Sequence, residues 1–75
     1  MMRHHVRRET VSSSAIASIG YDPRSRTLEV EFESGEVYHY FRVPASLWRA
    51  FRSAESKGTF FQSEIRGAFR FSRLT

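Results

Sequence analysis

The chain of 75 residues has no cysteine, only two prolines and four glycines, and no long run of apolar residues. Without cysteine it can form neither a disulfide framework nor a thiolate metal site, which fits a reducing compartment. No apolar stretch is long enough to cross a bilayer or to act as a signal peptide behind the basic N-terminus. These absences predict a cytoplasmic domain that does not enter a membrane.

The small size limits how stable such a domain can be. A chain this short buries only about 60% of the surface that its unfolded state exposes, which leaves a net stability of a few kcal/mol. Seven Phe, three Tyr and one Trp offset this limit, because large rings bury the most area per residue. We therefore expect one domain at most.

The clearest pattern is a strict alternation of apolar residues and glutamates over residues 28–33, within a strand expected from about Thr27 to Glu33. This alternation has the period of an extended strand, and a second apolar-rich run follows over residues 36–41. Ser34 and Gly35 lie between the two runs and predict a β-hairpin.

The hairpin loop decides which side chains are buried. A two-residue loop would require a positive φ at Ser34, which a residue with a Cβ resists, whereas a three-residue loop places only Gly35 in the left-handed region. We favour the three-residue loop, which pairs Val30 with Tyr38 and turns His39 to the other face, beside the glutamates. The predicted inner face consists of Leu28, Val30, Phe32, Tyr38 and Tyr40.

An earlier strand is expected over residues 15–21, before a turn that begins at Asp22. Ile16 and Ile19 have opposite parity within it, so either a bulge separates them or only one of them faces the core.

Two short helices are predicted behind the hairpin. Pro44 suits the first turn of a helix over residues 44–56, and Lys57-Gly58 would end that helix. A sequence of the capping-box type then introduces a second helix over residues 60–66, which would stop at Gly67.

The domain organisation follows from these elements. Residues 1–13 are rich in Arg, His and Ser and lack periodicity, so they are predicted to form a disordered basic N-terminal arm. Residues 14–75 are predicted to form a single α+β domain, a three-stranded antiparallel meander followed by two short helices packed on one face (β-β-β-α-α). Residues 68–74 would be an extended tail or a short edge strand.

Charge is distributed unevenly along this small basic chain. Residues 1–26 carry a net charge of +3, residues 27–41 carry −4, and residues 42–75 carry +5. Such an asymmetry can steer a polyanion toward one face of a domain.

The ordered set of motifs resembles the KTSC domain, a module named for its occurrence at the C-terminus of some lysyl-tRNA synthetases and also known as stand-alone small bacterial proteins. The resemblance covers about residues 13–74 and implies a β-β-β-α-α fold and a role in RNA binding, without catalytic residues. One departure is Gln62-Ser63, where relatives usually have an Asn after the aromatic pair. The motifs are Leu-x-Val-x-Phe at 28–32, Ser34-Gly35, Tyr38-His39-Tyr40, Val43-Pro44, Ser56-Lys57-Gly58, Phe60-Phe61 and Ile65-Arg66.

Aromatic and basic residues are the candidates for contact with RNA. Tyr38 and Tyr40 either stack on unpaired bases or are core tyrosines whose hydroxyls reach the rim, in which case Phe41 and Trp48 are the exposed rings. The basic residues either neutralise phosphates or form a solvated face. They are Arg42, Arg49, Arg52, Lys57, Arg66, Arg70 and Arg73.

No residue cluster indicates catalysis or metal binding. His4, His5 and His39 do not have the spacing of a zinc site, and His39 is expected to form a surface ion pair with Glu29 or Glu31.

We predict a non-enzymatic binding module without a cofactor, with RNA, such as tRNA, as its ligand. The alternative is a protein–protein adaptor that uses Val37, Phe41 and the outer face and edge of the sheet.

Overall fold

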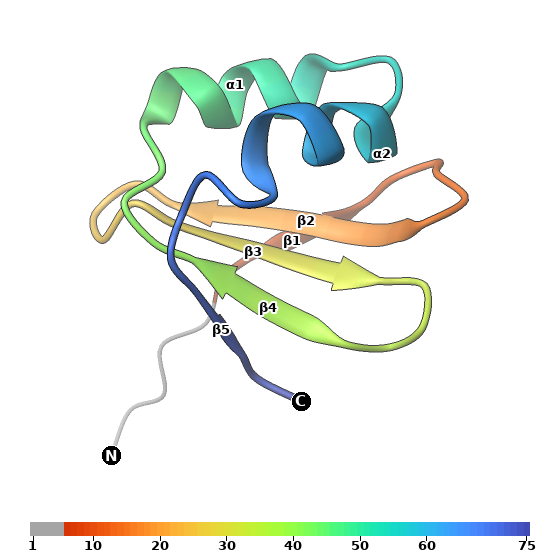
Figure 1. The fold of residues 1–75 in the computed structure, drawn as a ribbon, viewed down its shortest axis with the longest axis horizontal. Helices are drawn as coiled ribbons and strands as arrows, with labels where there is room; N and C mark the ends of the chain where they lie inside the picture. Colours follow the sequence, from red (N-terminus) through yellow and green to blue (C-terminus); the bar gives the residue numbers. More distant parts are fainter. Residues whose placement is uncertain (1–5) are drawn as a thin grey trace.

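The computed structural model describes residues 6–75, which form one antiparallel sheet with a layer of helices on one face (Figure 1). The helical layer lies between β4 and β5 in the chain and consists of α1 (Ala45–Ser53), α2 (Lys57–Phe60) and the π-helix η1 (Phe61–Ile65). The order of the strands in the sheet is their order in the chain. The strands are β1 (Arg8–Thr10), β2 (Ile16–Asp22), β3 (Thr27–Phe32), β4 (Val37–Tyr40) and β5 (Phe71–Arg73).

The α+β class is confirmed, but the predicted sheet of three strands is too small, because a short strand extends each edge. β5 pairs with β4 and occupies the segment for which a tail or an edge strand was expected. β1 pairs with β2 inside the predicted disordered arm, so that prediction is wrong for Arg8–Thr10. Residues 1–5 of the arm lie outside the described residues. β1 has no apolar alternation, because its three residues are all exposed and the backbone of β2 holds them.

The predicted register of the central hairpin is confirmed. Val30 pairs with Tyr38 and Leu28 with Tyr40, while Glu29 pairs with His39. Gly35 has a φ of 99°, and its N–H donates to the carbonyl of Phe32 at 2.8 Å. The three-residue loop therefore closes with glycine alone in the left-handed region.

A bulge resolves the mismatch between the two isoleucines of β2. The pairing of β2 with β3 shifts between Ile16 and Ser18. As a result both Ile16 and Ile19 face the helices and are fully buried, so the first of the two predicted alternatives is confirmed. The buried core consists of Ile16, Ile19, Leu28, Val30, Tyr40, Val43, Phe51, Phe61 and Ile65.

The helix boundaries differ from the prediction. α1 ends at Ser53, because Ala54 is extended with a ψ of 138°. Lys57-Gly58, expected to end the first helix, instead begin α2, since the Ser56 hydroxyl accepts from the Thr59 N–H at 3.2 Å and caps the new helix. The predicted capping box at Thr59 is thus displaced by a cap three residues earlier. Gly67, with a φ of 80°, follows η1 as predicted.

Gly20 allows β1 to lie close against β2. A Cβ at Gly20 would meet the carbonyl oxygen of Arg7 at 2.3 Å and the side chain of Val6 at 2.9 Å. No real Cβ tolerates the first of these contacts, and the atom involved belongs to the backbone. A side chain at this position therefore conflicts with the first strand pair of the sheet.

We expect Gly20→Ala to destabilise the domain by about 1–3 kcal/mol, because β1 must move away from β2 to make room. The free energy of unfolding from urea denaturation measures the loss. Gly58→Ala is the matched control, since its Cβ would find nothing closer than 3.9 Å and would lie in a helix. Equal stability of Gly20→Ala and the unmodified chain would contradict the expectation.

Candidate nucleic-acid interface

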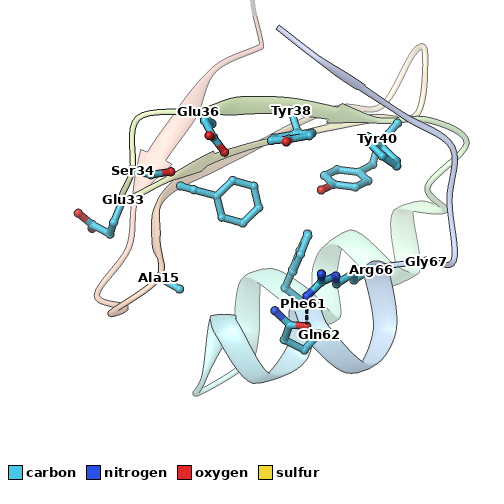
Figure 2. A pocket seen from close by; sticks show the side chains of 12 residues that line it. Ala15, Glu33, Ser34, Glu36, Tyr38, Tyr40, Phe61, Gln62, Arg66 and Gly67 are labelled. Atoms are coloured by element: carbon cyan, nitrogen blue, oxygen red, sulfur yellow. Dashed lines mark hydrogen bonds between the residues drawn. The ribbon is translucent and has the colours of Figure 1, made fainter. Parts of the chain in front are cut away.

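A cleft of about 560 Å³ lies between η1 and strands β3, β4 and β5. Figure 2 shows Tyr38 and Tyr40 on the sheet side of this cleft, and Phe61, Gln62 and Arg66 on the helical side. We call it the aromatic cleft. Its rings are Phe32, Tyr38, Tyr40, Phe61 and Phe71.

The rings of the aromatic cleft support one another. Tyr38 and Tyr40 stack with their centroids 6.2 Å apart, and Phe61 meets Tyr40 edge-on at 5.5 Å. Phe71 of the edge strand β5 lies 5.7 Å from Tyr38 and 5.9 Å from Tyr40. Tyr40 is a core residue with 6% exposure, whereas Phe71 is 61% exposed. The exposed part of the wall is therefore formed by half-buried Phe32 and Tyr38 and by Phe71.

The tyrosine hydroxyls in the cleft differ from the one outside it. The Tyr21 hydroxyl donates to the Val43 carbonyl at 2.5 Å. Within residues 6–75, the hydroxyls of Tyr38 and Tyr40 have no hydrogen-bond partner, and both side chains line the cleft. Burial, with a contribution from neighbouring Tyr38, raises the pKa of Tyr40 to about 12, and Arg66 acts in the opposite direction. Tyr40 therefore remains protonated and can donate a hydrogen bond.

The raised pKa of Tyr40 predicts that the stability of the domain falls in alkaline solution. An unfolded tyrosine ionises near pH 10, whereas folded Tyr40 resists ionisation until about pH 12. Its contribution to stability is complete below pH 10 and is lost as the pH rises toward 12, by an amount on the order of 2 kcal/mol. Urea unfolding at pH 8, 10 and 11.5 measures this loss, and Tyr40→Phe is expected to lose less over the same range. Parallel losses in the two proteins would contradict the assignment.

Three of the seven predicted cations are held by a glutamate or by a backbone carbonyl. Arg52 pairs with Glu9 at 2.9 Å and lies over the Trp48 ring at 5.9 Å. Arg73 pairs with Glu36 at 3.6 Å. The Lys57 ammonium donates to the Ala54 carbonyl. These groups lie in separate places, so the predicted set does not act as a unit.

The other four, Arg42, Arg49, Arg66 and Arg70, form no ion pair with a described residue. Arg42 and Arg70 line a second hollow of about 540 Å³ together with Phe41, whose side chain is 37% exposed. We call this the Phe41 hollow. The Phe41 N–H donates to the Arg70 carbonyl at 2.9 Å, which holds the connector from η1 to β5 beside the end of β4. In Figure 1 this connector (blue) runs from the helical layer past the end of β4.

The connector of residues 66–70 links the two hollows. It begins with Arg66 at the aromatic cleft and ends with Arg70 at the Phe41 hollow. Arg49 is exposed on α1, away from this segment in the chain, and Trp48, predicted to be an exposed ring, is half-buried where it stacks on Tyr21 with centroids 5.5 Å apart. Arg66 and Arg70 therefore lie at the two ends of one short connector, and Arg70 lies beside Phe41 and Arg42 of the segment that follows β4.

The sequence did not assign Phe61, Gln62 or Phe71 to the interface. Phe61, which falls within the second predicted helix, is a core residue that also lines the cleft. Phe71 was placed in the tail, where its alternation with arginine was the available signal. Only the pairing of Phe71 with Tyr40 brings it to the cleft.

The outer face of the sheet carries a polar row across three strands. Glu29 of β3 contacts His39 of the neighbouring strand β4 at 2.7 Å. On its other side Glu29 reaches over Gly20 of β2 and contacts Arg8 of β1 at 2.9 Å. The predicted ion pair of His39 with Glu29 is confirmed. The His39 ring lies against Phe41 with centroids 6.3 Å apart, so a polar residue separates Phe41 from Val37.

Residues 6–75 hold neither a cluster of metal-ligating side chains nor a helix that could span a membrane. No three His, Asp or Glu side chains of this part of the chain converge as metal ligands would. None of its helices has the length and apolar character needed to span a bilayer.

A known protein family and several individual proteins are similar to this chain. The family model for the KTSC domain matches residues 12–69. A stand-alone uncharacterised protein of Stutzerimonas stutzeri is 43% identical over 92% of this chain and 99% of its own length. Lysine–tRNA ligases of Nostoc punctiforme and of a second Nostoc strain are 42% and 39% identical over 83% of this chain, which spans only 11% of their length.

A solved structure has the same fold. The crystal structure of a KTSC domain protein from Yersinia pestis superimposes with a TM-score of 0.89 at 46% identity and covers 95% of this chain and all of its own. The family model and these relatives together show that the chain belongs to the KTSC domain family.

Proposed function

We propose that this KTSC domain is a non-catalytic module that binds RNA along the connector of residues 66–70. The proposal rests on the arrangement of arginines and exposed aromatic rings beside this connector. Arg66 at the aromatic cleft is followed by Arg70 and Arg42 around exposed Phe41, and none of the three is neutralised by a described carboxylate. Free guanidinium groups hold phosphates, and aromatic faces beside them accept bases of any sequence.

The relatives favour RNA over other polyanions. Two of them are lysine–tRNA ligases, whose name states that they act on a tRNA. A module that holds the RNA substrate would serve such an enzyme without taking part in its chemistry. A stand-alone copy would use the same surface for tRNA or for RNA of similar shape in the cytoplasm.

The charged groups of the outer sheet face differ in their partners from the cations along the connector. Glu29 is occupied by Arg8 and His39 on the outer face, and Ser18 donates to Glu31 at 2.8 Å. The outer-face charges Glu29 and Arg8 are thus paired with each other, whereas Arg42, Arg66 and Arg70 have no carboxylate partner among the described residues. An RNA strand is therefore directed to the connector.

We expect the domain to bind single-stranded RNA with an affinity that falls as salt rises. The double variant Arg42→Gln/Arg70→Gln should bind more weakly at low salt and reduce the slope of log affinity against log salt by about 1.4, since each phosphate contact contributes about 0.7 for single strands. Fluorescence anisotropy with a labelled octaribonucleotide at several salt concentrations measures both quantities.

The matched control is Arg52→Gln, which removes one cation that Glu9 already neutralises. It should leave the salt slope nearly unchanged. Failure of the unmodified domain to bind RNA at micromolar concentration and low salt would overturn the proposal. If Arg52→Gln reduced the RNA affinity and the salt slope as much as the double variant does, the interface would not lie at the connector.

A further inference from the structure

We propose that the aromatic cleft is a pocket for one unpaired ribonucleotide of the RNA strand, with the base against the rings and a phosphate on Arg66. This inference rests on the proposed RNA binding and adds to it a defined nucleotide site. It requires that the cleft match the base, the phosphate and the ribose of a single nucleotide.

The apolar part of the cleft fits a base. Its volume of about 560 Å³ lies within the range of about 300–1,000 Å³ that is usual for small-molecule pockets. Tyr38 and Phe71 offer partly exposed ring surface, and Phe61 closes the cleft from the helical side.

The polar groups of the cleft fit the edge of a base. The hydroxyls of Tyr38 and Tyr40 have no partner among the described residues, and Tyr40 is held in its protonated, donating form. A base carries acceptors and donors on its edge that can satisfy both hydroxyls. An aliphatic ligand would leave these hydroxyls unpaired.

The helical rim fits a phosphate. Arg66 Nη1 donates to Gln62 Oε1 at 3.0 Å, which fixes the guanidinium at the mouth and leaves its other donors free. Both residues are exposed, so a phosphate reaches them without entering the cleft. The connector then carries the strand on to Arg70 and Phe41, where the next phosphate and base would lie.

The hairpin rim fits a ribose. Glu33, Ser34 and Glu36 line the side of the cleft that faces Arg66 across the rings. Glu36 pairs with Arg73, whereas Glu33 has no ion pair with a described residue. A carboxylate here repels a second phosphate and accepts from a ribose hydroxyl, which favours RNA over DNA. The opposite charges of the two rims therefore set one orientation for the nucleotide.

The test compares four labelled probes of the same length: an octaribonucleotide, its abasic counterpart, the deoxyribose strand of the same sequence and the RNA duplex. We expect the abasic strand to bind at least about fivefold more weakly, because the stacking of even one base is lost. The deoxyribose strand and the duplex should also bind more weakly than the single-stranded RNA. All probes retain phosphates, so phosphate contacts alone predict no such loss for the abasic strand.

Substitutions in the aromatic cleft test whether the base binds there. Phe71→Ala removes a ring of the cleft, and Leu74→Ala is its matched control, because both side chains lie in the same C-terminal segment and are 61% and 49% exposed. Phe71→Ala and Tyr38→Phe should weaken the octaribonucleotide but not the abasic strand, and Leu74→Ala should change neither. Circular dichroism checks that each variant is folded.

Four results would overturn the nucleotide pocket as proposed. Equal binding of the abasic strand and the octaribonucleotide would remove the pocket while RNA binding through phosphates stands. Equal losses in Phe71→Ala and Leu74→Ala would move the stacking elsewhere, and equal affinity for the deoxyribose strand would remove the contact to ribose. Absence of binding to every probe would overturn the proposed function as well, and would leave the adaptor as the remaining candidate.

Discussion

The register between β3 and β4 is the constraint on which the rest of the structure depends. Gly35 adopts a positive φ and closes a three-residue loop, which places Tyr38 opposite Val30 and Tyr40 opposite Leu28. Because side chains alternate between the faces of a sheet, a slip of one residue would exchange the two faces. His39 would then enter the core, and the tyrosines would leave the cleft.

This register gives the two faces of the sheet different chemistry. The helical side gathers aromatic rings, and the opposite side gathers the ionic row in which Glu29 contacts Arg8 and His39. The row reaches β1 because Gly20 has no side chain to keep that strand away. One face can therefore offer stacking surfaces, while the other presents carboxylates that are already occupied.

Cations that look equivalent in the sequence have different surroundings in the fold. Arg52 and Arg73 are each close to a glutamate, whereas Arg66 and Arg70 lie on a connector without one. Exposed ion pairs contribute little stability, but they neutralise charge that would otherwise attract a phosphate. The surface that can meet RNA is thus smaller than the count of basic residues implies, and it lies beside the rings.

Local rules in the sequence determined the hairpin, its register and the α+β class, because alternation and the need for a glycine act within a few residues. They also indicated that Ile16 and Ile19 require a bulge if both are buried. Tertiary structure alone decided the edge strand β1, since it is held by the backbone of β2 and has no pattern of its own. It also decided the position of Phe71 beside Tyr38. The start of α2 was decided by competition between two neighbouring caps, of which Ser56 acts in place of Thr59. These outcomes depend on contacts between residues distant in the chain, or on competition between neighbouring caps, and a local pattern does not contain them.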